Sequence, residues 1–466
     1  MSEVMEKNEI NEKVEGEKRK ENKMGTMPIP KLLISMSLPI IISMLVQACY
    51  NIVDSIFVAQ IDPNNKAFTA VSLAFPVQNL MIAVGAGTGV GINALLSRSL
   101  GEKKFEKANK VANTGIYLAA FSYVAFLLFG IFFVDGFSGL QTKDPEIAQY
   151  CVDYLRVICF GSIGIFMQIT MERLLQSTGK SLLSMVVQLA GAIFNLIFDP
   201  ILIFGLFGFP KMGIAGAALA TVLGQIVSMT LGIIINIRCN KEIKIYPTHY
   251  RPDRKTVGGI YAIAVPSILL MSIGTVMTLC MNQILITSAA SVAVFGAYFK
   301  LQSFFIMPVT GLNNGMVPII AYNYGAKNKH RILATMRLSI LIACGIMIFG
   351  MGIFQIFPVP LLKMFSASPE MLAIGVSAFR IISLHYIFAG VCIIFLSVFQ
   401  ALGKSIYSLY VSLGRQLVVL VPVAWMLSEW FGLRAVWWAF PVAEIASLLL
   451  SVLFMIRVYR KCIHSL

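Results

Sequence analysis

Twelve apolar runs of about 20 residues or more account for most of this 466-residue chain. They cover about residues 31–59, 67–96, 111–134, 149–176, 181–205, 213–238, 258–287, 292–322, 332–356, 370–402, 405–428 and 433–457. An α-helix of about 20 residues matches a hydrocarbon core of roughly 30 Å, so each run can cross a bilayer. With 58% hydrophobic and 13% charged residues, the chain is too apolar for a water-soluble protein. The sequence predicts an all-α integral membrane protein with twelve transmembrane helices.

Basic residues gather on one side of this twelve-span arrangement. The connections at 98–110, 238–255 and 327–331, and the chain after residue 456, are rich in Lys and Arg, whereas the opposite connections carry single bases. The positive-inside rule therefore predicts a multi-pass protein of the cytoplasmic membrane with both termini in the cytoplasm. Because this topology explains the net charge of +15, we expect the bilayer and no nucleic acid as the partner of the basic surface.

The two halves of the chain fall into register at a shift of 224 residues. Segment 144–158 then lies on 368–382, and "QSTGKS" (176–181) lies on "QALGKS" (400–405). After a five-residue slip, 213–228 lies on 432–447. Since each half holds an even number of spans, both halves enter the membrane in the same direction. We expect two pseudo-symmetric six-helix bundles with a cleft between them near the middle of the membrane.

These patterns predict five segments. They are a disordered cytoplasmic tail over 1–30, an N-terminal six-helix lobe over 31–238, a cytoplasmic linker over 239–257, a C-terminal six-helix lobe over 258–457 and a cytoplasmic tail over 458–466.

Polar side chains form a stripe along one face of the first predicted span. Gln47, Asn51 and Asp54 stand there at positions i, i+4 and i+7. An ionised carboxylate at the centre of a membrane helix costs at least about 2.5 kcal/mol, so we expect Asp54 to meet a cation, a partner or a proton.

A second stripe follows the fifth span, where Gln188, Asn195 and Asp199 stand at i, i+7 and i+11. Asp199 lies in the outer half of its lobe, at about the depth of Asp54, and Thr221 of the sixth span can add a hydroxyl. Two adjacent, partly desolvated carboxylates cannot both ionise freely, so such a site can bind H⁺ or Na⁺. Asp54, Asp199 and Asn195 are then the expected Na⁺ ligands. The alternative is an interhelical hydrogen-bond cluster with one protonated Asp.

Further charged residues lie inside the predicted spans. By helical rise, Glu172 stands roughly 16 Å nearer the cytoplasm than Asp199. It is either a second proton or substrate acid, or a local partner of a base such as Arg98. Arg415 and Glu444 reach similar depth in the C-terminal lobe and are expected to form an ion pair, whereas His385 is expected to be a core residue. The candidate cleft residues are Gln47, Gln188, Gln283, Lys300, Arg415 and Glu444.

At this point the chain resembles the multidrug and toxic compound extrusion family. The likeness rests on the doubled twelve-span plan and on "LPIIISMLVQACYNIVDSIFVA" (38–59), "RSLGEKKFEKA" (98–108) and "GAIFNLIFDPILIFG" (191–205). The resemblance implies drug extrusion in exchange for inward H⁺ or Na⁺. It also implies a coupling site made of Asp54, Asn195, Asp199 and Thr221. The sequence departs from the family pattern at Glu172 and Arg173, where many relatives have Asn, and this leaves the choice of ion open.

The sequence therefore predicts a monomeric secondary antiporter that exports amphipathic, often cationic, lipophilic compounds and has no cofactor besides its coupling ion. The nearest alternative is a lipid-linked precursor flippase, which a cation-rich cleft favours; Lys300 and Arg415 are the expected cations. A membrane-embedded enzyme is disfavoured, because the chain has no H-E-x-x-H, G-x-S-x-G or G-x-x-x-x-G-K-[ST] motif.

Overall fold

The computed structural model describes residues 21–62, 66–246, 248–365 and 368–466, and these residues are helical apart from their connections. The first half contains α2 (Lys23–Thr26), α3 (Ile29–Ala59), α4 (Lys66–Gly101), α5 (Phe105–Phe132), α6 (Val134–Gln141), α7 (Pro145–Phe160), α8 (Ile163–Ser177), α9 (Ser181–Phe204) and α10 (Ile214–Cys239). The second half contains α11 (Arg254–Leu285), α12 (Ala289–Gly325), α13 (Lys329–Ile356), α14 (Pro358–Lys363), α15 (Pro369–Ser383), α16 (Tyr386–Ala401), α17 (Ser405–Leu413), η1 (Gly414–Leu420), α18 (Val421–Phe431), η2 (Leu433–Trp438), α19 (Ala439–Val458) and η3 (Tyr459–Ile463).

The described residues contain ten helices long and apolar enough to cross a membrane, or twelve when each of two bent helix pairs counts as one span. The bent pairs are α7 with α8, at 46°, and α15 with α16, at 49°. They correspond to the fourth and tenth predicted spans. The predicted all-α membrane fold is therefore confirmed, with ten to twelve spans.

The internal repeat is visible in the backbone. Helices α5 and α13 have the same bounds once 224 residues are added. The turns that precede them share a left-handed residue, Lys103 with φ 58° and Lys327 with φ 55°. The turns after α8 and α16 likewise hold Gly179 and Gly403 at φ 87° and 72°. The sequence repeat is thus a structural repeat, down to the geometry of single turns.

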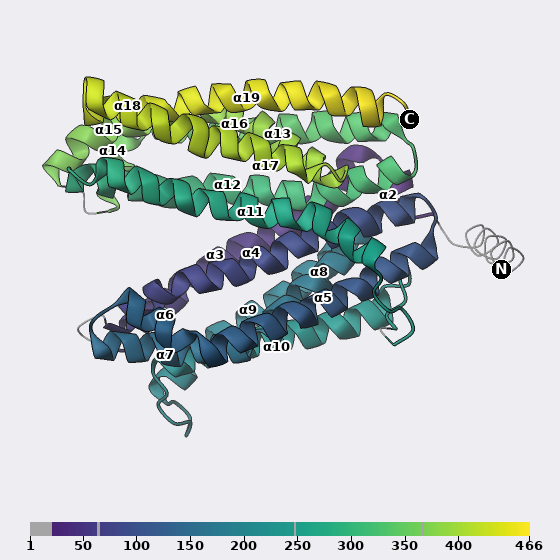
Figure 1. Ribbon diagram of the computed structural model, residues 1–466, viewed down its shortest axis with the longest axis horizontal. Coiled ribbons are helices and arrows are strands. Elements are labelled where there is room, and N and C mark those ends of the chain that lie inside the picture. The colour runs from purple at the N-terminus through teal and green to yellow at the C-terminus, as the bar shows by residue number, and fades with distance from the viewer. Residues whose placement is uncertain (1–20, 63–65, 247, 366–367) are drawn as a thin grey trace, which may run out of the picture.

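Figure 1 shows the two halves as separate lobes that diverge at one end and meet at the other, where α2 and the C-terminus lie. Glycines permit this meeting. A Cβ atom built on Gly101 of α4 would lie 1.9 Å from the Tyr322 carbonyl oxygen of α12, and one on Gly325 would lie 2.1 Å from the Arg98 carbonyl oxygen. The ends of α4 and α12 therefore cross in direct backbone contact.

Packing of the chain against the lobes begins before residue 30, where the N-terminal tail is predicted to end. Residues 1–20 lie outside the described residues. Met24 of α2, however, is fully buried, and its carbonyl oxygen accepts hydrogen bonds from Asn323 at 3.0 Å and from Arg331 at 3.1 Å. These contacts anchor α2 on the C-terminal lobe. Apolar composition alone missed this segment, because a single turn of helix carries no periodic pattern.

The connection between α10 and α11 is held against α5 by polar contacts. The Asn113 side chain donates to the Lys244 carbonyl oxygen at 2.9 Å, and Lys110 forms an ion pair with Asp253 at 2.8 Å. Asp253 is also the N-cap of α11, where it accepts from the Thr256 N–H at 2.9 Å. The linker thus runs along the N-terminal end of α5.

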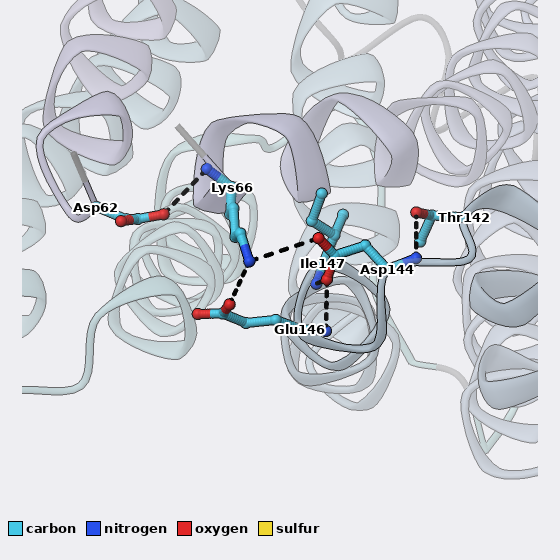
Figure 2. Close-up of polar contacts among 6 residues, drawn as sticks. All are labelled: Asp62, Lys66, Thr142, Asp144, Glu146 and Ile147. Atoms are coloured by element: carbon cyan, nitrogen blue, oxygen red, sulfur yellow. Dashed lines mark hydrogen bonds and ion pairs between the residues drawn. The ribbon is translucent and has the colours of Figure 1, made fainter. Parts of the chain in front are cut away.

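A further set of polar contacts closes the opposite end of the N-terminal lobe (Figure 2). The ammonium group of Lys66, at the start of α4, lies between the carboxylates of Asp144 and Glu146 at the start of α7. Asp144 caps α7 by accepting from the Glu146 N–H at 2.9 Å, and this bond helps to hold the pKa of Asp144 below its usual range. These contacts join the α3–α4 connection to α7.

Candidate functional site

A cavity of about 710 Å³ lies between the two lobes. Its N-terminal wall comes from α3, α4, α7, α8, α9 and α10, and its C-terminal wall comes from α11, α12, α16, η1 and α19. The lining mixes apolar side chains with amides, hydroxyls and a few charged groups. Such a surface suits ligands that carry both apolar and polar parts.

The two acids predicted from the polar stripes lie next to each other beside this cavity. Asp54 is on α3 and lines the cavity, whereas Asp199 is on α9, is 1% exposed and lies behind the lining. Their carboxyl groups are within hydrogen-bonding reach of one another. The Asp54 Oδ1 atom is buried and has no hydrogen-bond partner among the described residues. A proton or a small cation bound between the acids would satisfy this oxygen.

Asn195 and Thr221 complete the group. Helices α9 and α10 pack closely, because a Cβ atom on Gly191 would lie 2.6 Å from the Gly224 carbonyl oxygen. This contact brings Asn195 to α10. With its amide oriented so that both polar atoms find partners, Asn195 donates to Asp199 Oδ2 at 2.9 Å and accepts from the Thr221 N–H at 3.1 Å. We call Asp54, Asp199, Asn195 and Thr221 the acid-pair site.

The remaining members of the two stripes also lie together. The Gln188 amide donates to the Gln47 side-chain oxygen, so α9 and α3 are joined about two to three helical turns away from the acids. Asn51 is exposed toward the cavity and lines it. The stripes on the first and fifth spans thus face each other, as their periodicity predicts.

Two tyrosines that the sequence reasoning missed border the acid-pair site. Tyr50 of α3 lines the cavity and lies close to both acids. Tyr154 of α7 accepts a hydrogen bond from Gln78 at 2.9 Å and also lies near the acids. The position of Tyr50 four residues before Asp54 is the signal that could have placed it on the same helical face.

Glu172 lines the cavity and is 8% exposed. Its Oε1 atom accepts a hydrogen bond from Gln168 at 3.0 Å. The alternative of a local pair with Arg98 is wrong, because Arg98 is bound by Glu102 at 2.9 Å. Glu172 is therefore a cavity acid separate from the acid-pair site.

Arg173, the next residue, also lines the cavity and joins the lobes. It donates to Gln176 at 2.9 Å within α8 and to Asn314 of α12 at 3.1 Å. The sequence did not reveal this contact between lobes, because hydropathy does not show which helix of the other lobe faces a given residue.

Two of the expected cleft residues are elsewhere. Gln283 of α11 and Lys300 of α12 have exposed side chains, and neither lines the cavity. A single polar residue in an apolar run carries no information about which face is lipid-free, so these expectations were wrong. The cationic side chains that line the cavity in the described part of the chain are Arg173 and Arg415.

The predicted pair of Arg415 and Glu444 is present, with an N–O distance of 3.3 Å. Glu444 is almost fully buried, and Arg415 reaches the cavity. His385 lies in the C-terminal core, where its Nδ1 atom is 2.6 Å from the Ile382 carbonyl oxygen. The ion pair of Arg415 and Glu444 therefore joins η1 to α19.

Breaking this ion pair is expected to destabilise the C-terminal lobe. Arg415→Met alone leaves Glu444 buried without its partner, which costs about 3 kcal/mol. Arg415→Met with Glu444→Leu removes both charges and should recover most of this loss. Thermal unfolding of the purified protein in detergent measures the difference. If the double variant is no more stable than Arg415→Met, the pair is not the source of the effect.

Comparison with known proteins gives one consistent result. The family model described as MatE matches residues 39–201 and 262–426. The multidrug export protein MepA of Staphylococcus haemolyticus is 27% identical over 415 residues, which cover 89% of this chain and 90% of that protein. MepA of Staphylococcus aureus is 25% identical over 424 residues, or 90% and 91% of the two chains. A structure described as the outward-facing conformation of a multidrug resistance MATE family transporter is 24% identical, with a TM-score of 0.87 over 95% of this chain and 98% of that one.

Proposed function

Because this chain belongs to the MatE family, we propose that it works as an antiporter of the cytoplasmic membrane that exports amphipathic, often cationic compounds in exchange for H⁺ or Na⁺. It is a homologue of multidrug export proteins and a multi-pass membrane transporter, not an enzyme. In this proposal the protein acts as a monomer, has both termini in the cytoplasm and takes lipophilic small molecules from the cell or the bilayer.

The observation that carries the proposal is the acid-pair site at the wall of the cavity. Asp199 is buried and Asp54 is half-buried beside it, and neither acid forms an ion pair with Lys or Arg within the described residues. Two carboxylates so placed repel each other unless a proton or a cation lies between them. The site is thus built to be filled by a small positive charge.

Coupling requires that the ion and the substrate compete or prefer different states of the protein. The lobes meet at the end that the positive-inside rule assigns to the cytoplasm and diverge at the other end (Figure 1), so in our account this conformation faces outward. In our account, an ion entering from outside binds the acid pair, shifts α3 and disfavours the state that holds substrate. The substrate then leaves before the protein changes from the outward-facing to the inward-facing state.

The alternative of a lipid-linked precursor flippase needs free cations for its anionic cargo. Both cationic side chains in the cavity already have partners: Arg415 contacts Glu444, and Arg173 contacts Gln176 and Asn314. The acids Asp54 and Glu172 line the same cavity. The arrangement favours a cationic or neutral guest over a pyrophosphate.

Everted membrane vesicles with the full chain test this function. A pH gradient and a Na⁺ gradient are imposed separately, and accumulation of the cationic dye ethidium is followed by its fluorescence. We expect one of the two gradients to drive dye accumulation, and that gradient identifies the ion. Accumulation that needs neither gradient would contradict antiport.

A further inference from the structure

A second cavity, of about 550 Å³, lies where the lobes meet and is separate from the acid-pair site. Its walls come from α4, α11, the end of α12, the α16–α17 turn and the C-terminal helix α19 with η3. Four basic side chains line it: Arg98, Lys404, Arg457 and Lys461. No acidic side chain is among the described residues that line it. We call it the basic pocket.

Three of these charges have no counter-charge among the described residues. Arg98 is paired with Glu102 and stacks on the Tyr324 ring at 4.8 Å. By contrast, no ion pair within the described ranges involves Lys404, Arg457 or Lys461. Like charges held around one hollow repel each other unless an anion enters.

The internal repeat supplies a comparison within the same molecule. Lys180 of the N-terminal lobe corresponds to Lys404. Its ammonium group donates to the Cys239 carbonyl oxygen at 2.6 Å and to Asn240 Oδ1 at 3.3 Å, and Glu242 lies close to it. At the register of the last span, Glu242 corresponds to Lys461. Lys180 thus has an acidic residue, Glu242, close to it. In the C-terminal lobe, the position that corresponds to Glu242 carries another cation, Lys461.

The walls of the basic pocket also fit a particular kind of anion. Tyr324 and Tyr407 line it and carry hydroxyl groups that can donate to oxygen atoms of a ligand, and Leu95, Ile263 and Leu402 add apolar surface. A phosphate group joined to an acyl glycerol matches this combination of charge and apolar surface. Basic pockets between membrane helices at the cytoplasmic side are known to bind lipid headgroups of this type.

We propose that the basic pocket binds the phosphate group of an anionic phospholipid from the inner leaflet. The phosphate lies among Lys404, Arg457 and Lys461, and its acyl chains leave along the apolar side. The bound lipid joins α4 of one lobe to α11, the α16–α17 turn and α19 of the other. The site is independent of the transport function proposed above.

Native mass spectrometry of the full chain in neutral detergent tests the proposal. The protein is titrated with dioleoyl phosphatidylglycerol and, separately, with dioleoyl phosphatidylcholine. We expect one phosphatidylglycerol to bind at least about tenfold more tightly than phosphatidylcholine. Each basic side chain near such a headgroup contributes about fivefold, so Lys404→Gln with Lys461→Gln should weaken binding about 25-fold.

Lys241→Gln with Arg460→Gln is the matched control, because it removes two exposed basic charges outside the pocket. We expect its affinity for phosphatidylglycerol to stay at the wild-type value. Equal binding of the two lipids by the wild type, or an equal loss in the control, overturns the proposal. A competition experiment with glycerol 3-phosphate distinguishes a soluble phosphate ligand from a lipid. If it displaces phosphatidylglycerol at millimolar concentration, the ligand is a soluble phosphate and the lipid assignment is wrong.

Discussion

Asp199→Asn is expected to lower the initial rate of gradient-driven dye accumulation by about 100-fold. An amide cannot take up a proton, and it carries no negative charge to hold Na⁺. Removing one charged member of a buried, hydrogen-bonded group costs several kcal/mol, which corresponds to a loss of this size. The rate is measured in everted vesicles under the gradient that drives the wild type.

Two further variants make the result specific. Asp54→Asn should give the same loss, because it removes the other half of the acid pair. Asp153→Asn removes an acid from α7 that contacts Gln149 at 2.8 Å, so it should transport like the wild type. Retention of gradient-stimulated export by Asp199→Asn would remove the acid pair from the mechanism.

Gly101→Ala is expected to prevent the lobes from meeting as they do here. The added methyl group would lie 1.9 Å from the Tyr322 carbonyl oxygen, a backbone atom that cannot move without moving α12. We therefore expect the ends of α4 and α12 to separate and the export rate to fall at least about tenfold. Distances between spin labels at Lys103 and Lys327, in a background without other reactive cysteines, report the separation.

Gly345→Ala serves as the control for this experiment. Gly345 lies inside α13, and apart from the backbone of its own helix no heavy atom of the described residues lies within 4 Å of the position of its Cβ. Alanine is the better helix former, so this change should leave the label distance and the export rate unaltered. If Gly101→Ala behaves in the same way, the backbone crossing is not what closes this end of the protein.

Much of the fold could be predicted from the sequence, because the spans and the repeat are patterns within the chain. Apolar runs longer than the bilayer core give the spans, and matched segments such as 144–158 and 368–382 give the two lobes. The bend between α7 and α8 could not be predicted from the run 149–176. It depends on packing, since Val222 of α10 fills the space beside Gly161.

The candidate site, too, could be predicted from the sequence only in part. The proximity of Asp54 and Asp199 could be predicted, because each ends a periodic polar stripe. A lone charge in lipid is costly, so each carboxylate is expected to have a partner. Lys300 could not be assigned, because one polar residue defines no face. The contact from Arg173 to Asn314 joins the two lobes, and only the three-dimensional arrangement reveals it.

Antiport by the acid pair requires that it give up a small cation when a substrate binds. Purified wild-type protein in weakly buffered detergent is mixed with saturating ethidium, while a pH indicator follows H⁺ and radioactive Na⁺ is followed in parallel. We predict that about one H⁺ or one Na⁺ is released for each dye bound, and that the Asp54→Asn, Asp199→Asn double variant releases none. Dye binding by the wild type without release of either ion, or undiminished release from the double variant, would contradict the account.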